Sequence, residues 1–282
     1  MIDLHVHSTF SDGSYTPAEL VDMAVADGGI KALALTDHDG LGGLPQFNEA
    51  CQAKGLIGIP GVEISIEFQP GTLHVLGYFI DAGNLPFAAA LEDLRDGRES
   101  RNQKILQKLN ELGCALSWEE VAAFAGEDVV GRPHFAQAMI ARGFVKTKEQ
   151  AFDRYLAKGK PAYLDRTRLT APDSIRLIHG AGGIAVLAHP ATLKVSKVEL
   201  HRIVAELAAE GLDGIEAWYS EHTQDQQKAF AKLAAEQGLI LTGGSDFHGT
   251  TNPEVRLGRG FGNLEVPDEL MEALYARAGR TR

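Results

Sequence analysis

The sequence predicts an α/β fold in which strands and helices form a distorted barrel, with a helical domain inserted in the middle of the chain. Three observations lead to this prediction. Short apolar runs alternate with amphipathic segments in both end regions, a pattern that favours parallel strands joined by helices. A length of 282 residues suits one such barrel, or a smaller domain with an insertion. Residues 84–162 interrupt the alternation with helical patterns alone.

The strand candidates are short runs rich in aliphatic and β-branched residues. They cover residues 2–7, 31–36, 57–68, 72–79, 183–189, 214–219 and 239–243, and we expect a late strand near 258–263. Helix starts between them carry capping boxes. Thr16 with Glu19 encloses Pro17 at the first helical position, and Ser196 with Glu199 offers a second box. Helices should therefore follow at both places.

The middle of the chain has leucine and isoleucine at helical spacing and no convincing strand. We predict that residues 84–162 form a helical insertion that caps the substrate site, and that residues 1–83 and 163–282 form the barrel. Ser117 with Glu120, and Thr147 with Gln150, indicate helix starts inside the insertion. A further helix, beginning at Thr170, should return the chain to the barrel.

Composition and charge exclude several classes of protein. Hydrophobic residues at 44% and charged residues at 23% are typical of globular proteins. A formal net charge of −11 argues against binding long nucleic acids, whereas a small anionic substrate remains compatible. The sequence has neither a membrane-spanning apolar run nor a secretory leader pattern, so we expect a cytoplasmic protein without membrane contact. Cys51 and Cys114 lack zinc-ligand spacing, so a bound metal must use nitrogen and oxygen ligands.

The strongest chemical signal lies at the start of the chain. His5 and His7 are two residues apart on a predicted strand and so project from the same face, and Asp12 follows in a loop rich in serine and glycine. Two imidazoles and a carboxylate form a mixed site suited to Mn²⁺, Fe²⁺ or Zn²⁺. Taken alone, a His-x-His pair could equally be structural or exposed to solvent.

The same residue types recur where later strand candidates end. They are Asp37, His38 and Asp39, then His189, then Asp246 and His248, while Glu63 and His74 lie on neighbouring strand candidates. In parallel α/β barrels the loops at the carboxyl ends of the strands converge on one mouth. Any one of these residues could be a buried structural histidine or a capping aspartate. Together they predict a single metal-binding cavity.

The motifs that carry these residues resemble those of the polymerase and histidinol phosphatase (PHP) family, in the same order. They are His5-Val6-His7-Ser8, Thr36-Asp37-His38-Asp39, Gly61-Val62-Glu63, His74, Ala188-His189-Pro190 and Gly244-Ser245-Asp246-Phe247-His248. The resemblance implies a (β/α)₇-like barrel. It is greatest to members with a helical insertion that act as 3′,5′-nucleoside bisphosphate phosphatases, whose relatives trim short RNA from the 5′ end.

The resemblance also implies three divalent metal ions, with Mn²⁺ favoured over Fe²⁺ and Zn²⁺. It assigns His5, His7, Glu63 and Asp246 to one ion, Glu63, His74 and His189 to a second, and Asp12, His38 and His248 to a third. Asp37 and Asp39 are interpreted either as residues that orient His38 or as loop caps.

Coordination to a divalent ion lowers the pKa of water from 15.7 toward about 7, so such a site can attack phosphorus near neutral pH. Asp246, as a ligand beside the nucleophile, is the candidate catalytic proton acceptor. The proton for the leaving group could come from the third ion, from His222 or from a water molecule.

For the substrate's second phosphate, the insertion offers arginines, because guanidinium groups bind phosphate oxygens in pairs. The candidates are Arg98, Arg101, Asn102, Arg132 and His134, and the arginines could instead be solvated residues of a helix face. Phe124, Phe135 and Phe144 could stack a base, although aromatic residues at helical spacing usually belong to a core.

The sequence leaves rival functions open. Within enzymes these are an exonuclease on short RNA and a phosphatase for a small monoester such as histidinol phosphate. From another class, the chain could be a metal-binding regulatory module without turnover. The complete set of ligand candidates argues against that last alternative. The sequence does not indicate an oligomeric state.

Overall fold

The computed structural model describes the whole chain except residues 67, 69, 126–129, 165–168 and 282, and the side chain of Arg98. Two compact units make up the chain: Met1–Leu91 with Arg168–Arg282, and Glu92–Thr167. The domain boundaries taken from the sequence, after residue 83 and before residue 163, stay a prediction. None of the helices within the described ranges is both long enough and apolar enough to cross a membrane.

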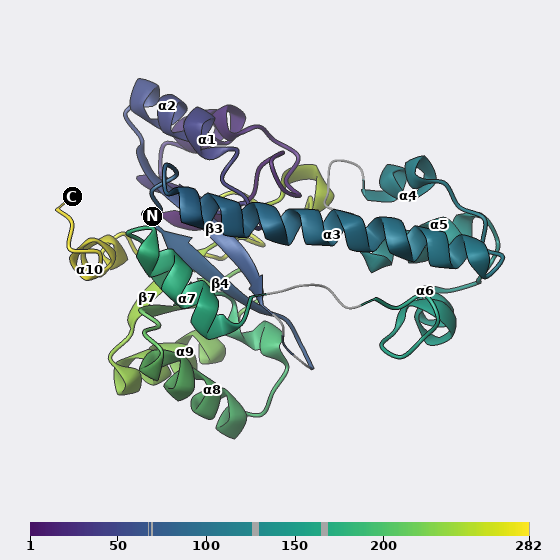
Figure 1. Cartoon of the computed structure of the whole chain (residues 1–282). Coiled ribbons are helices and arrows are strands. Elements are labelled where there is room, and N and C mark those ends of the chain that lie inside the picture. Colours follow the sequence, from purple (N-terminus) through teal and green to yellow (C-terminus); the bar gives the residue numbers. More distant parts are fainter. Residues whose placement is uncertain (67, 69, 126–129, 165–168, 282) are drawn as a thin grey trace. The chain divides into compact units, whose positions relative to one another are not determined.

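The first unit is a nearly closed seven-stranded barrel with helices on its outside (Figure 1). Its strands follow one another around the sheet in chain order and are β1 (Asp3–Val6), β2 (Ala32–Leu35), β3 (Ile57–Ile66), β4 (Leu73–Tyr78), β5 (Ile184–Leu187), β6 (Gly214–Tyr219) and β7 (Ile240–Gly244). The barrel is completed where the end of β1 meets the segment after β7, because Val6 forms a parallel bridge with Phe247. This confirms the predicted α/β barrel.

Strand β4 runs antiparallel to both β3 and β5, whereas the other neighbouring pairs in the sheet are parallel. The expectation of parallel strands is therefore wrong for β4. The reason is the short connection from Ile66 to Leu73, because a parallel crossover needs a dozen or more residues. The reversal places His74, near the start of β4, opposite Ser65 near the end of β3. His74 therefore lies beside Glu63, which is also in β3.

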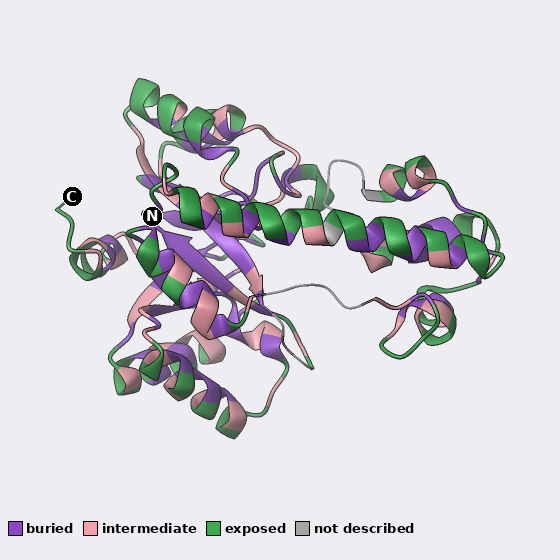
Figure 2. Ribbon diagram, in the orientation of Figure 1, coloured by how far each residue is buried: buried purple, intermediate pink, exposed green. Residues whose placement is uncertain are grey.

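Six α-helices lie wholly within the barrel unit, among its described residues, and three of them begin at the residues predicted from the sequence. The six helices are α1 (Pro17–Asp27), α2 (Leu44–Lys54), α7 (Ala171–Gly180), α8 (Lys197–Ala209), α9 (Gln224–Gln237) and α10 (Leu270–Arg277). Thr16 and Glu19 form the predicted capping box, and the hydroxyls of Ser196 and Thr170 accept from the backbone N–H groups three residues on. The strands are buried, whereas the helices turn exposed faces outward (Figure 2).

The late strand expected near residues 258–263 does not form. The structure has turns there, with one antiparallel bridge between Arg256 and Gly260. Three glycines explain the difference: Gly258, Gly260 and Gly262 have φ angles of 71°, 53° and 103°, a left-handed conformation that is incompatible with an extended strand.

The secondary structure of the second unit, among its described residues, consists of helices joined by turns and loops. Helix α3 (Leu85–Glu111) starts in the first unit and continues into the second, which also contains α4 (Trp118–Ala125), α5 (Arg132–Ala141), α6 (Lys148–Ala151) and a π-helical turn, η1 (Phe152–Leu156). Ser117 and Glu120 form their capping box, and Thr147 caps α6. The unit has its own core, in which Phe135 is fully buried and Phe144 packs at the edge, whereas Phe124 is exposed.

Candidate metal centre

Nine predicted ligands come together at one end of the barrel. They are His5 in β1, His7 and Asp12 after it, His38 after β2, Glu63 in β3, His74 in β4, His189 after β5, and Asp246 with His248 after β7. Eight of them take part in clusters whose candidate ligand atoms lie within 4.8 Å of one another, and His189 contacts Glu63. The convergence of strand ends expected from the sequence is therefore present in the structure.

The turn that carries Asp246 is held tightly against β1. The backbone N–H of Asp246 donates to the carbonyl of His5 at 2.8 Å, and the N–H of His7 donates to the carbonyl of Phe247 at 3.0 Å. Asp3, which is fully buried, accepts from both the N–H and the hydroxyl of Ser245. Asp246 adopts φ of 55°, a strained conformation for a residue with a side chain. These bonds stabilise that conformation and direct the carboxylate toward the two histidines of β1.

Glu63 is the centre of the cluster. One of its oxygens, Oε2, lies 3.3 Å from His5 Nε2, 3.2 Å from His7 Nε2 and 3.1 Å from His38 Nδ1. The other, Oε1, lies 2.7 Å from His74 Nδ1 and 3.0 Å from His189 Nε2. A single buried carboxylate thus contacts five imidazoles through its two oxygens, so it can serve as a metal ligand together with either set.

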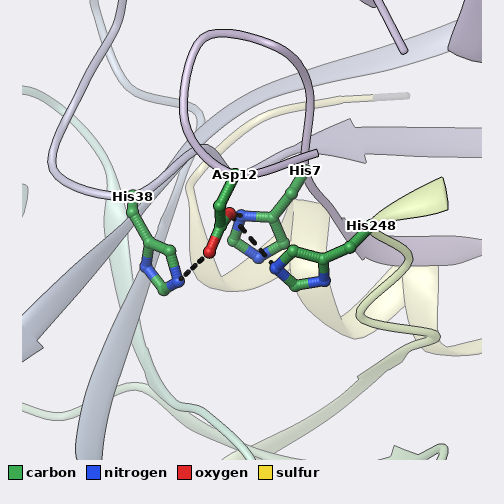
Figure 3. A group of neighbouring side chains, drawn as sticks. All are labelled: His7, Asp12, His38 and His248. Atoms are coloured by element: carbon green, nitrogen blue, oxygen red, sulfur yellow. Dashed lines mark ion pairs between the residues drawn. The ribbon is translucent and has the colours of Figure 1, made fainter. Parts of the chain in front are cut away.

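Asp12 organises a second part of the cluster (Figure 3). Its carboxylate lies 3.1 Å from His248 Nε2, and 3.4 Å from both His7 Nδ1 and His38 Nε2. The four residues come from three separate loops. His7 and His248 stack with ring centroids 4.2 Å apart, so the rings fix one another as well as facing Asp12.

The donor set fits divalent ions. The ligand atoms fall into three groups: His5, His7, Glu63 and Asp246; His7, Asp12, His38 and His248; and His38, Glu63 and His74. Among the described residues, the buried atoms His5 Nε2, His7 Nε2 and His38 Nδ1 have no hydrogen-bond partner. Buried polar atoms rarely lack a partner unless an unseen group, such as an ion, supplies one. Mixed imidazole and carboxylate ligands suit Mn²⁺, Fe²⁺ and Zn²⁺.

The electrostatics of the protein alone lead to the same conclusion. Burial opposes protonation of His5, yet the carboxylates of Glu216, Asp246 and Glu63 raise its pKa well above the ordinary range. For His7, burial is again overcome, by Asp246 and Glu63, and its pKa is raised to about 10. Burial also opposes ionisation of Glu63, but the surrounding histidines hold its pKa well below normal. The cavity therefore stabilises positive charge. A bound divalent ion can supply this charge in place of the protons on the histidines.

His38 behaves differently from His5 and His7. Burial lowers its pKa to about 4 despite the carboxylates of Glu63 and Asp12, with the neighbouring His7 and His74 acting in the same direction. A neutral imidazole is the form that binds a metal. His38 is thus already in its ligating state near neutral pH.

Three buried residues around the cluster were not singled out from the sequence. Glu216 lies 3.0 Å from His5 Nδ1, the hydroxyl of Tyr219 donates to Asp246 Oδ2 at 3.1 Å, and Asp3 binds the Ser245 turn. The available signal for Glu216 was a carboxylate within an otherwise apolar strand, whereas Asp3 shares its short strand with His5. A buried charge requires partners, so such a residue indicates a polar network.

Asp37 and Asp39 stabilise loops. Asp37 accepts from the N–H and the hydroxyl of Ser8 and from the hydroxyl of Ser11, each at 2.7 Å. Asp39 accepts from the N–H of Ser65 at 3.1 Å. These bonds favour the interpretation of both residues as loop caps over direct orientation of His38.

The predicted substrate-binding residues belong to the helical unit, and those with described side chains bond to other residues of that unit. Arg101 donates to Asn102 Oδ1, Asn102 donates to the carbonyl of Val130 at 2.5 Å, and Arg132 donates to the carbonyl of Leu156. His134 Nδ1 accepts from the N–H of Gly131 at 3.1 Å. The side chain of Arg98 lies outside the described part of the chain. Their role in binding substrate stays a prediction.

A barrel whose mouth gathers histidines and carboxylates around a shared glutamate defines a hydrolase of the metal-dependent type. Residues 3–158 match the PHP domain, and the chain belongs to that family, as its motifs predict.

The chain is 36% identical to a 3′,5′-nucleoside bisphosphate phosphatase from Chromobacterium violaceum, over 88% of this chain and 87% of that protein. It is also 36% identical to a 5′-3′ exoribonuclease from Haemophilus influenzae, over 87% of this chain and 89% of that protein. Among solved structures, a proposed metal-dependent phosphoesterase from Bifidobacterium adolescentis matches with a TM-score of 0.77 and 28% identity, covering 98% of this chain and 96% of that one.

Proposed function

We propose that this protein is a metal-dependent phosphatase that removes the 3′-phosphate of a 3′,5′-bisphosphonucleoside, giving the 5′-monophosphate and phosphate. The observation that carries the proposal is the position of Glu63, with five imidazoles around its two oxygens. The bisphosphate substrate is proposed because the Chromobacterium violaceum relative, similar over most of both chains, is named for that activity.

The charge of the site supports an obligatory metal. Asp12, Glu63 and Asp246 place three carboxylates at the mouth, and the fully buried Glu216 adds a fourth behind them. A phosphate monoester is itself an anion, so bound divalent cations would offset its repulsion by these carboxylates. Both the ligand types and the charge therefore favour divalent cations as part of the working enzyme.

We assign three ions to this site, with Mn²⁺ first and Fe²⁺ or Zn²⁺ as alternatives. His5, His7, Glu63 and Asp246 would hold one, Asp12, His38 and His248 another, and Glu63 with His74 and His189 the last. When bound, such ions neutralise phosphate oxygens and lower the pKa of water. His7 and His38 each belong to two of the three groups of candidate ligand atoms, so each would help to position two neighbouring ions.

The chain's own residues control the protons. Asp246 is the proposed proton acceptor; burial raises its pKa, but its neighbours His5 and His7 hold that pKa well below normal in the metal-free protein, so the carboxylate is ionised there. The Tyr219 hydroxyl donates to Asp246 Oδ2 and fixes its direction, which leaves Oδ1 facing the histidines.

The geometry argues against His222 as the proton donor to the leaving group. His222 is buried, its Nδ1 donates to the carbonyl of Ala217 at 2.9 Å, and burial lowers its pKa. A neutral imidazole whose N–H is already bonded to the backbone is a poor acid. The third ion or a water molecule therefore remains as the proposed source of that proton.

The helical insertion is the proposed source of specificity, with Arg98, Arg101, Asn102, Arg132 and His134 as candidates for holding the phosphate that is not cleaved. Arginine forks match phosphate geometry, which is the reason for this proposal. The contacts of Arg101 and Arg132 within their own unit are compatible with a guanidinium held in a fixed direction.

A second candidate is 5′-3′ hydrolysis of short RNA, favoured by the similarity to the Haemophilus influenzae exoribonuclease. A small monoester phosphatase and a regulatory module without turnover are the remaining rivals. As for partners, a small anionic nucleotide or short RNA in the cytoplasm is proposed, and neither long nucleic acid nor a membrane is expected.

Phosphate release by the Mn²⁺-loaded protein tests the proposal. The substrates are a 3′,5′-bisphosphonucleoside, the two corresponding monophosphates, histidinol phosphate and a 5′-phosphorylated oligoribonucleotide. We expect the bisphosphate to give the highest kcat/KM and the 5′-monophosphate as product. Preference for the oligoribonucleotide would favour the exonuclease, and no release from any ester would refute the proposed function.

A further inference from the structure

Glu216 is a buried carboxylate whose two oxygens both contact candidate metal ligands. It lies in β6, is fully buried, and is flanked by apolar residues in the sequence Gly214–Tyr219. Its Oε1 lies 3.0 Å from His5 Nδ1. Its Oε2 accepts the backbone N–H of His189 at 2.8 Å. The two residues that it contacts face different oxygens of Glu63, His5 facing Oε2 and His189 facing Oε1.

Burying the Glu216 carboxylate is unfavourable in free energy unless the charge is paired or hydrogen bonded. Within the described ranges, the only ion-pair partner recorded for Glu216 is His5. Strand β6 therefore carries a buried charge that contacts two candidate metal ligands, His5 and His189. Packing alone does not explain a charge at this position.

The bond to His5 determines which nitrogen of the imidazole faces the metal centre. A carboxylate accepts, so Nδ1 of His5 carries a proton, and in the neutral imidazole that binds a metal Nε2 then carries the lone pair. Nε2 is the buried atom without a hydrogen-bond partner, and it lies 3.3 Å from Glu63 and 3.4 Å from Asp246. The bond thus presents a ligating atom to the cavity in the correct direction.

The bond to His189 holds the backbone of a strained residue. His189 has φ of 24° and ψ of 64°, an unfavourable conformation for a residue other than glycine. Its ring is held separately, because Nδ1 lies 2.9 Å from the hydroxyl of Thr192 and Nε2 lies 3.0 Å from Glu63. Glu216 stabilises the strained backbone, and Thr192 fixes the ring.

We propose that Glu216 is a positioning residue for the metal centre, which fixes the tautomer of His5 and the backbone of His189 so that both imidazoles present Nε2 to Glu63. This inference rests on the proposed metal-dependent function. Glu216 touches neither substrate nor reacting atoms, and it acts through the two histidines.

The glutamine variant separates this role from packing, because Glu216→Gln preserves size but leaves only one acceptor oxygen. If the amide oxygen faces His5, the amide NH₂ opposes the N–H of His189 and that bond is lost. If the amide NH₂ faces His5, it donates to Nδ1, and the proton of His5 moves to Nε2, the atom needed for the metal. Neither orientation preserves both bonds.

The first measurement is metal affinity, obtained by titrating the metal-free full chain with Zn²⁺ against a competing chelator. Partners that orient metal-binding histidines typically contribute about 10–100-fold in affinity. We expect a loss in that range for Glu216→Gln. The matched control is Glu221→Gln, which removes a charge from an exposed residue just after β6 and should change affinity less than about threefold. Equal affinity of Glu216→Gln and the wild-type protein would overturn the inference.

The second measurement does not depend on how well the variant folds. In the Zn²⁺-loaded wild-type protein, ¹⁵N NMR of the imidazoles should show His5 protonated at Nδ1. A His5 protonated at Nε2 would overturn the inference.

Neither measurement uses a substrate, so the inference and the proposed function can fail separately. A wild-type protein that binds Zn²⁺ but hydrolyses no phosphate ester would refute the function and leave the role of Glu216 intact. An active wild-type enzyme whose Glu216→Gln variant binds Zn²⁺ normally would refute the role of Glu216 alone.

Discussion

Replacing Glu63 by glutamine should disable the metal centre with little change in shape. The substitution removes one negative charge from the carboxylate that lies within 3.3 Å of His5, His7 and His38 on one oxygen, and within 3.0 Å of His74 and His189 on the other. Glu63 belongs to two of the three groups of candidate ligand atoms. Both of the corresponding ions should therefore bind more weakly.

The size of the effect follows from Coulomb's law. Two unit charges about 4 Å apart interact by about 4 kcal/mol at the effective dielectric constant of about 20 that describes protein sites. Water and neighbouring groups compensate for part of this when a charge is removed. A remaining loss of about 2.7 kcal/mol per ion already corresponds to about 100-fold in affinity, because 1.4 kcal/mol is tenfold. We expect at least that loss for the Glu63→Gln variant.

The assay is metal content and affinity of the purified protein, followed by kcat/KM for phosphate release. The matched control is Asp39→Asn, since Asp39 is also buried beside β3 and accepts from Ser65, but belongs to none of the three groups. The control should lose less than about tenfold in metal affinity. Equal losses in the two variants, or full metal occupancy in Glu63→Gln, would refute the central position given to Glu63.

Three further outcomes are expected. Because the pKa of His7 is raised to about 10 in the metal-free protein, metal binding at pH 7 should release protons and weaken as pH falls, which calorimetry in two buffers of different ionisation enthalpy measures; no proton release would contradict it. Burial lowers the pKa of His222 below its unfolded value of about 6.5, so stability that is present above that pH should be lost as pH falls through the folded pKa. Thermal unfolding at pH 7.5 and 5.5 should show a smaller loss for His222→Asn than for the wild-type protein, and equal losses would contradict this. If Arg101 holds the uncleaved phosphate, Arg101→Ala should lower kcat/KM roughly 10- to 150-fold for the bisphosphate but barely for the monophosphate, whereas Arg142→Ala, at an exposed residue of the same unit, should affect neither. Equal slowing of both substrates would assign Arg101 to the fold.

The sequence predicted the barrel well where the local signal was strong. Seven short apolar runs became strands, because each lies between clear turn or helix-start residues. The ligands were predictable for a related reason: His7, His38, His189 and Asp246 lie within three residues of a strand's end, where parallel topology brings the chain to one end of the barrel. Such residues need only the strand order to be placed correctly.

The remaining features depend on partners that are far apart in the sequence. The reversal of β4 follows from a connection too short for a crossover, a signal that was present but outweighed by the general α/β pattern. The bonds of Glu216 to His5 and of Asp3 to Ser245 join residues more than 200 positions apart, so no local pattern indicates them. Turns at Gly258 and Gly260 replaced a predicted strand, because their left-handed backbone conformations override the alternation of side chains.

Turnover after metal removal tests the central claim most directly. The purified protein is analysed for bound metals, stripped with a chelator, and assayed for phosphate release from a 3′,5′-bisphosphonucleoside before and after Mn²⁺ is restored. The cluster around Glu63 predicts bound divalent metal, loss of activity in the stripped protein and its recovery with Mn²⁺. Undiminished hydrolysis by the metal-free protein would contradict the account.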